Sequence, residues 1–330
     1  MEDLSDRLKL IVIVGPTASG KSDLAIRLAK KYSGEIISAD SRQVYYGMNL
    51  GTGKVPKDSF RNFQSFDTLR TSFSISNFQS NPKSKILNKD FYSRGVKHHL
   101  IDVASPKKQF TASDFKELGE KAIKDIVARG KIPIIVGGTG FYIDILLGRM
   151  TVAQVPPNPK LRKHFDKLSA EHLFKMLRKL DPHRAKTIDR HNKRRLMRAL
   201  EIVITTGKPV PKLNLSTPYQ VLWLGLKPKN LDLKIEKRLN MRLKHGLARE
   251  VKRLHEKGLS WKRLENFGLE YRWLSLYLQK KVTYIEMKEK LLRDIVRYSK
   301  RQMTWFKGNK EIYWIKDGKI AQVLFQRFIG

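Results

Sequence analysis

The feature that most constrains the fold is the octapeptide GPTASGKS at 15–22, which follows the apolar run KLIVIV at 9–14. It matches the pattern G-x-x-x-x-G-K-[ST], a loop whose backbone amides surround phosphate oxygens at the start of a helix. Apolar residues then recur at helical spacing, at Leu24, Ala25, Leu28 and Ala29. A strand, a loop and a helix in this order predict a phosphate-binding loop on a parallel sheet.

Each residue type in this loop has a physical role. The backbone amides of 18–21 face phosphate oxygens, the Lys21 ammonium supplies charge, and the Ser22 hydroxyl can ligate Mg²⁺. We predict a diphosphate- or nucleotide-binding site at Gly15, Pro16, Thr17, Ala18, Ser19, Gly20, Lys21 and Ser22. The loop alone does not identify the phosphate compound or the bond that is broken.

Strand and helix patterns continue to alternate after the loop. Short apolar runs at 35–38 and 132–136 predict strands, and 114–129 has the spacing of a helix. This alternation predicts an α/β fold, a parallel-sheet core with helices on both faces. Ligands of such sheets bind at the carboxyl ends of the strands. Because Asp40 and Thr139 follow two predicted strands, we expect both in one cleft with the phosphate loop.

Several polar residues near these strands allow both a structural and a functional interpretation. Asp40 would cap nearby amides, or would act as a general base or a carboxylate near a metal. The glycines around Thr139 would make a tight turn, or would let a substrate approach the backbone. Because adjacent residues of a strand point to opposite faces, His98 and His99 do not easily share one metal ion. We expect a structural role for at least one of them.

The charge of the chain indicates a polyanionic partner. It has 67 Lys and Arg residues against 31 Asp and Glu, a formal net charge of +36. Such a field attracts nucleic acid. Two predicted helices carry arginines along one face, at Arg190, Arg194 and Arg198 and at Arg293, Arg297 and Arg301. A solvated basic surface is the alternative, but the two faces and the total charge together favour RNA.

Composition and pattern also divide the chain. We predict a core at 1–150 with a surface insertion at about 56–95, a basic helical lobe inserted at 151–200, and a mainly helical remainder at 201–330 that packs on the core. The absence of cysteine excludes disulfides, thiolate zinc sites and cysteine nucleophiles. The apolar runs are too short to cross a bilayer, and the first residues lack the apolar segment of a signal peptide. We therefore expect a cytoplasmic protein without membrane association.

Six segments, in this order and spacing, resemble the tRNA dimethylallyltransferases, also called isopentenyl-tRNA transferases. They are IVIVGPTASGKS, IISADSRQVYYGMNLGTGK, HHLIDVASP, IPIIVGGTGFYI, KRRLMRALEI and SKRQMTWF. The resemblance implies transfer of a dimethylallyl group from dimethylallyl diphosphate to the exocyclic amine (N6) of the adenosine 3′-adjacent to the tRNA anticodon, with release of diphosphate. It also implies that Mg²⁺ assists and that the basic lobe grips the anticodon stem-loop, for which a monomer suffices.

The resemblance assigns roles to individual residues as well. Asp40 would accept the amine proton, Thr139 would position the amine and the departing oxygen, and Arg238 would lie near the phosphates. The implied tRNA contacts are Asp40, Ser41, Arg42, Gln43, Thr139, Arg162, Arg194, Arg195, Leu196, Met197 and Arg198. The chain departs from the family pattern at 266–274 and in the insertion before His98, so no tRNA contact is carried over to those segments.

Two other functions are compatible with the phosphate loop. A kinase for a small molecule or nucleoside would bind ATP there, and an RNA-binding protein would use a nucleotide as a switch. The kinase does not need two basic helices, and the switch leaves the carboxylate of Asp40 without a role.

Overall fold

The computed structural model describes residues 7–58, 90–151, 153, 155–211 and 217–330. These residues belong to two compact units, one made of Met1–Leu146 and Pro218–Gly330 and the other of Leu147–Thr217. The insertion expected at about 56–95 lies outside the described residues except for its two ends, 56–58 and 90–95. In the described part of the chain, no helix combines the length and the apolar character needed to pass through a bilayer.

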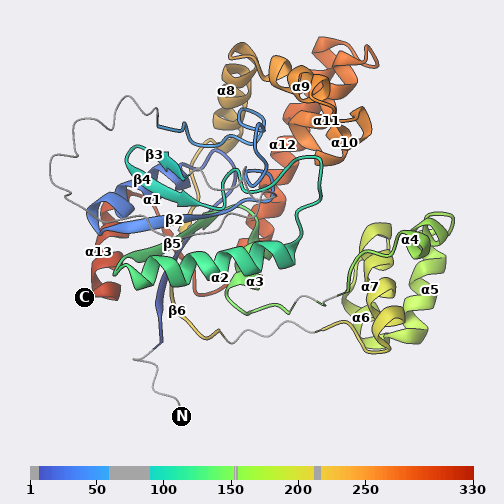
Figure 1. The fold of residues 1–330 in the computed structure, drawn as a ribbon, viewed down its shortest axis with the longest axis horizontal. Helices are drawn as coiled ribbons and strands as arrows, with labels where there is room; N and C mark the ends of the chain where they lie inside the picture. Colours follow the sequence, from blue (N-terminus) through green and yellow to red (C-terminus); the bar gives the residue numbers. More distant parts are fainter. Residues whose placement is uncertain (1–6, 59–89, 152, 154, 212–216) are drawn as a thin grey trace, which may run out of the picture. The chain divides into compact units, whose positions relative to one another are not determined.

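The first unit is built on a seven-stranded sheet with the order β3-β4-β2-β5-β1-β6-β7 (Figure 1). The strands are β1 (Lys9–Val14), β2 (Gly34–Ala39), β3 (Phe91–Ser93), β4 (Val96–His99), β5 (Ile132–Gly137), β6 (Gln220–Leu226) and β7 (Tyr313–Ile315). Neighbouring strands are parallel except for β3 and β4. β1 lies between β5 and β6, with Val14 opposite both Gly137 and Gly225.

Helices cover both faces of this sheet, which confirms the predicted α/β fold. The covering helices are α1 (Lys21–Lys31), α2 (Ala112–Ala128), α3 (Gly140–Leu146) and α13 (Gly318–Ile329). Side chains alternate along β1, so Ile11 and Ile13 face the core formed with α1 and α13, whereas Val12 points the other way. On that other face lie α2 and α3, where the rings of Phe115 and Tyr142 stack 4.2 Å apart.

A second core in the same unit joins the C-terminal helices to the loop after β2. The helices are α8 (Leu231–Lys244), α9 (Leu247–Glu256), α10 (Trp261–Phe267), α11 (Leu269–Leu278) and α12 (Tyr284–Lys307). Val44 and Met48 of the loop are fully buried against residues such as Leu239 and Leu264. The loop that follows β2 is therefore part of this second core, although it has no regular secondary structure.

The sequence analysis missed β6, although β1 pairs with this strand along the whole length of β1, from Lys9 to Val14. Its sequence, QVLWLGL, is apolar on both faces and has no alternation, as expected for a strand covered on both sides. Such a short run does not distinguish a buried strand from a helix by periodicity alone. The remainder at 201–330 thus supplies β6 as well as helices and β7, the latter within EIYWIK, where the sequence predicts a short strand.

The second unit, Leu147–Thr217, is helical. It contains α4 (Pro159–Asp166), α5 (Ala170–Leu180), α6 (Pro182–Thr187) and α7 (Lys193–Thr206). Asn158, Ser169, Asp181 and Asn192 cap the four helices, each accepting a hydrogen bond from a first-turn amide. Leu173, Leu177, Leu196 and Leu200 are completely buried in its small core.

Candidate active site

A cavity of about 1040 Å³ opens at the carboxyl ends of β1, β2 and β5 in the first unit. Its walls come from the phosphate loop, the loop after β2, and helices α8, α10, α11 and α12. Asp40 and residues 17–22 line it together, as expected from their positions after strand ends. Thr139 is close by, since its Oγ1 accepts a hydrogen bond of 3.2 Å from the Ser41 amide.

The phosphate loop has a backbone that constrains its residue types. Gly15 has a φ of +155°, and a Cβ there would lie 2.8 Å from the carbonyl oxygen of Leu226. Gly20, with φ +86°, stands before the first turn of α1. In the described part of the chain, the buried Ser19 Oγ has no hydrogen-bond partner. An unpaired hydroxyl inside a glycine-rich loop is suited to an incoming phosphate oxygen.

Three cations gather beside this loop. Arg238, on α8, donates from Nη1 to Thr17 Oγ1 at 3.2 Å and from Nη2 to Gly53 O at 3.2 Å. Burial, together with the neighbouring Arg242, lowers the pKa of Arg238 to about 10. Burial and the charge of Arg238 lower the pKa of Lys21 to about 8. The cavity therefore holds positive charges that an anion would stabilise.

The sequence analysis missed Arg242, although it follows Arg238 by one helical turn. Its Nη1 donates to Glu270 Oε1 at 2.9 Å, and within the described ranges of the chain this is the one ion pair that the cation cluster forms. Gly53 makes room for both arginines, since a Cβ there would lie 1.9 Å from Arg242 Nη2 and 2.0 Å from Arg238 Nη2. The i, i+4 spacing of two arginines, together with this glycine, is the signal that could have identified the second one.

Asp40 combines the two interpretations that its position allows. Its Oδ1 accepts hydrogen bonds from the amides of Arg42, at 2.8 Å, and Gln43, at 3.3 Å. Its Oδ2 has no donor among the residues that the structure describes. One oxygen thus orients the carboxylate, while the other is free for a ligand in the cavity.

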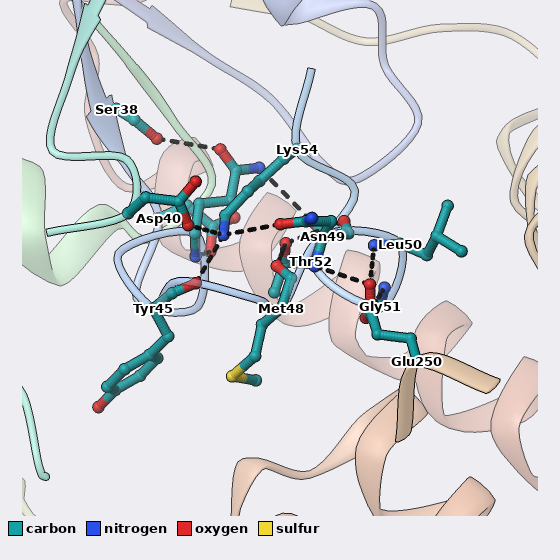
Figure 2. A network of polar contacts seen from close by, with 12 residues as sticks. Ser38, Asp40, Tyr45, Met48, Asn49, Leu50, Gly51, Thr52, Lys54 and Glu250 are labelled. Atoms are coloured by element: carbon teal, nitrogen blue, oxygen red, sulfur yellow. Dashed lines mark hydrogen bonds and ion pairs between the residues drawn. The ribbon is translucent and has the colours of Figure 1, made fainter. Parts of the chain in front are cut away.

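A polar network holds the loop after β2 in place, and Figure 2 shows it. Glu250 of α9 is buried and accepts hydrogen bonds from the amides of Asn49, Leu50 and Gly51 at 2.7–3.1 Å. Lys54, whose side chain is 3% exposed, donates to the Tyr45 carbonyl and to Asn49 Oδ1 (Figure 2). A buried carboxylate with several amide donors fixes a loop without regular secondary structure.

The segment 266–274, where the sequence departs from the family pattern, also borders the cavity. Phe267, Gly268, Leu269, Glu270 and Arg272 line it. Arg42, a predicted tRNA contact, donates from Nε to the Phe267 carbonyl at 3.0 Å, and its guanidinium lies 5.5 Å from the Phe267 ring centre. Arg42 is therefore held against α10. Ser41 and Gln43 line the cavity beside it.

Further basic residues surround the mouth of the cavity. They are Lys234, Lys237, Arg272, Arg297 and Arg301, and all are exposed. Arg297 and Arg301 belong to the second of the two arginine faces that the sequence indicates. A rim of this kind suits a polyanion larger than diphosphate.

The two histidines differ in position: His98 lines the cavity, whereas His99 is not among its lining residues and contacts Glu35. His98 is buried, and burial lowers its pKa to about 4, whereas His99 Nε2 lies 2.7 Å from Glu35 Oε2. Glu35, His99 and Asp125 lie close enough to share a metal ion, but Arg129 and Lys131 already bind the Glu35 carboxylate. Because two cations already bind the Glu35 carboxylate, we interpret this cluster as a structural ion-pair network.

In the second unit the predicted tRNA contacts differ in exposure. Leu196 and Met197 are buried in its core, so their side chains pack the unit instead of forming a surface. Arg194 and Arg195, in the first turn of α7, are exposed, and the structure records no ion pair for either in the part it describes.

Arg162 and Arg198 are both engaged by Glu201, which is fully buried. Arg162 donates to both Glu201 oxygens, at 2.9 and 2.8 Å, and Arg198 donates to Oε2 at 2.5 Å. Burial raises the pKa of Glu201, but the hydrogen bonds from Arg162, from the Asn158 amide and from Arg198 outweigh it and lower the pKa to about 2. Arg162 thus joins α4 to α7, whereas Arg198 pairs with Glu201 within α7.

Comparison with known proteins agrees with this geometry. The family model described as IPP transferase matches residues 84–309, and the model described as isopentenyl transferase matches residues 8–72. The tRNA dimethylallyltransferase 1 of Syntrophus aciditrophicus is 39% identical over 97% of this chain and 97% of its own. That of Citrifermentans bemidjiense is 36% identical over 98% and 97%.

Solved structures give the same result. The tRNA isopentenylpyrophosphate transferase of Bacillus halodurans is 30% identical, with a TM-score of 0.64 over 97% of this chain and 96% of its own. A eukaryotic dimethylallyltransferase captured acting on tRNA is 26% identical, with a TM-score of 0.70 over 93% of this chain and 73% of its own. The chain is thus an isopentenyl transferase by fold and sequence. It belongs to the family of tRNA dimethylallyltransferases.

Replacing Glu201 with Ala should destabilise the second unit, because it leaves Arg162 and Arg198 without their shared carboxylate. Losing one partner of a buried pair costs about 3–5 kcal/mol, and we expect the lower end because both arginines are partly exposed. Hydrogen exchange of α4 and α7 amides in the full chain should become about 100-fold faster. Glu171→Ala, which removes an exposed pair with Lys175, is the control and should change little. Equal exchange in the two variants would contradict the assignment.

Proposed function

We propose that this protein transfers the dimethylallyl group of dimethylallyl diphosphate to N6 of the adenosine 3′-adjacent to the tRNA anticodon, releasing diphosphate. Its family membership supports this reaction class. The observation that carries the assignment is the under-neutralised cation cluster of Lys21, Arg238 and Arg242 in the same cavity as the free oxygen of Asp40. A leaving-group site and a base within one cavity are what the transfer needs. The kinase alternative is not favoured, because the relatives and structural neighbours are named for prenyl transfer.

The reaction forms a bond between N6 and the allylic carbon as the bond from that carbon to the diphosphate oxygen breaks. The lone pair of the adenine amine is delocalised into the ring, so removal of its proton by Asp40 helps the attack. The electron pair of the broken bond goes to the diphosphate, whose charge Lys21, Arg238 and Arg242 stabilise. Thr139 would position the amine. The adenosine must leave the base stack to reach the cavity, as in other enzymes that modify bases.

Mg²⁺ suits the donor set at the phosphate loop. Ser22 lines the cavity, and its hydroxyl would be one ligand of the ion. Diphosphate and water oxygens, the hard ligands that Mg²⁺ prefers, would supply the others. Bound there, Mg²⁺ would offset part of the negative charge of the leaving group. We further propose that one copy of the chain binds one anticodon stem-loop and that the protein acts in the cytoplasm. The basic residues at the mouth of the cavity and the first turn of α7 would contact the RNA backbone.

The direct test incubates the protein with unmodified tRNA, dimethylallyl diphosphate and Mg²⁺, followed by mass spectrometry of the digested nucleosides. We expect a prenylated adenosine and one diphosphate released per transfer. A parallel reaction with ATP in place of the prenyl donor separates the alternatives. ATP turnover without any prenylated adenosine would overturn the proposal.

Asp40→Asn should lower kcat while leaving tRNA binding close to that of the unchanged protein. The amide oxygen of asparagine can still accept hydrogen bonds from the Arg42 and Gln43 amides, so the loop is retained, but the base is lost. General-base catalysis contributes about 10²–10⁴-fold, which sets the expected loss. Single-turnover rates with saturating tRNA, together with filter-binding affinities, measure the two effects. A variant that keeps its rate would remove Asp40 from the mechanism.

Binding of the prenyl donor should weaken as the pH rises through about 8. The lowered pKa of Lys21 means that the free protein loses this cation above pH 8, whereas anion binding favours its protonated form. A diphosphate ester changes charge near pH ~6, below this window. Calorimetry with a thiolo analogue, in which sulfur replaces the bridging oxygen, measures the affinity between pH 7 and 9.5.

Two variants at this position separate the lysine from other causes. Lys21→Arg keeps its charge at this position throughout the range, so the decline in affinity through pH 8 should disappear, and Lys21→Met should bind weakly at every pH. A decline that persists unchanged in both variants would assign the titration to another group.

Replacing Arg194 and Arg195 together with Ala should weaken tRNA binding and reduce its dependence on salt. Each phosphate contact contributes roughly 0.7–0.9 to the slope of log K against log salt concentration, so the double variant should lose about 1.5. Arg327→Ala, an exposed arginine on α13, serves as the control and should leave the slope unchanged. Identical slopes in the double variant and the unchanged protein would exclude these arginines from the RNA surface.

A further inference from the structure

Helix α12 forms part of the cavity wall, and one of its faces carries three side chains with polar groups at helical spacing: Tyr298, Gln302 and Trp305. Two of them contact the segment that follows β5: Gln302 Nε2 donates to the Gly138 carbonyl and Trp305 Nε1 donates to Asp144 Oδ2, each at 2.9 Å. Tyr298 lines the cavity. This face of α12 therefore acts as a support for the segment that carries Thr139.

Gln302 is unusual among the three because it also reaches the phosphate loop. Its Oε1 accepts a hydrogen bond of 2.9 Å from the Thr17 amide, and its Nε2 donates one of 2.9 Å to the Gly138 carbonyl. The side chain is only 6% exposed. Thr17 lies 285 residues away in sequence and Gly138 lies 164 away, so one amide joins three distant segments.

The sheet itself does not fix the spacing of these two loops. The pairing of β1 with β5 ends at Val14 and Gly137. After it, the Thr139 amide donates to the Ala39 carbonyl of β2 at 3.2 Å, a contact that does not involve the phosphate loop. Beyond the paired residues, Gln302 provides the bridge between the two loops. Gly138 must be glycine for the bridge to form, because a Cβ there would lie 2.1 Å from Gln302 Nε2.

We propose that Gln302 is a positioning residue for the transfer, setting the distance between the leaving-group site and the amine site. This inference rests on the proposed function, in which the phosphate loop holds the diphosphate and Thr139 lies beside the amine. Displacement at one carbon requires nucleophile, carbon and leaving group to be aligned, and a shift of ~1 Å is enough to lower a rate about 100-fold. Of the common side chains of this length, only an amide or a protonated carboxyl offers both the donor and the acceptor that the bridge uses.

Gln302→Leu removes both hydrogen bonds and keeps the apolar volume. We expect kcat to fall about 10- to 100-fold, with the affinities for tRNA and for the thiolo analogue within threefold of the unchanged protein. Gln279→Leu is the matched control. Gln279 also bridges two segments, donating to Glu265 Oε1 at 2.9 Å and to the Ser275 carbonyl, but it does not line the cavity. A structural role alone would lower the melting temperature of both variants and leave both kcat values unchanged.

Gln302→Glu tests the same bridge without changing the shape of the side chain. When protonated, the carboxyl group has one donor and one acceptor and can replace the amide; when ionised, it repels the Gly138 carbonyl. The ratio of its kcat to that of the unchanged protein should therefore rise as the pH is lowered from 8 to 6. Restored activity at low pH supports the bridge even if Gln302→Leu folds poorly.

The outcomes separate this inference from the function on which it rests. Absence of prenylated adenosine with the unchanged protein would refute the proposed function. An active unchanged protein, with a Gln302→Leu variant that folds and retains its kcat, would overturn the positioning role alone. A Gln302→Glu variant with a constant activity ratio between pH 6 and 8 would overturn it as well.

Discussion

The main constraint on the active site is the mutual repulsion of three neighbouring cations, Lys21, Arg238 and Arg242. Among the described residues, Glu270 alone forms an ion pair with one of them, and the lowered pKa values of Lys21 and Arg238 reflect the repulsion and burial that remain. A diphosphate would relieve both. The arrangement that destabilises the free protein is therefore the one that binds the leaving group, and the fold must supply the rigidity that keeps three like charges in place.

That rigidity comes from contacts between distant segments and does not come from the strands alone. Glu250 fixes the loop after β2 through three backbone amides, and Gln302 joins the phosphate loop to the segment after β5. Both side chains are buried in the C-terminal helices. The sheet thus brings the loops to one edge, while α9 and α12 determine how they are held there.

This division explains what could be predicted from the sequence. The phosphate loop, Asp40 and Thr139 follow strand ends, and their convergence results from the geometry of parallel strands. Glu250 and Gln302 have no local pattern, because their partners are remote in sequence and are determined by packing. Arg242 has only its spacing of one helical turn from Arg238. The strand β6 was not predicted for a different reason. A short run that is apolar on both faces has no periodicity that would distinguish a strand from a buried helix.

The second unit shows why a motif transfers more safely than the role of each residue in it. In α7, successive residues turn by about 100°, so a run of basic and apolar residues cannot all face one partner. Leu196 and Met197 turn into the core, Arg198 reaches the buried Glu201, and Arg194 and Arg195 remain exposed. A buried carboxylate without its arginines would be strongly destabilised, so Arg162 and Arg198 have a structural reason to be arginine that does not involve RNA. The surface available to tRNA phosphates on α7 is consequently its first turn.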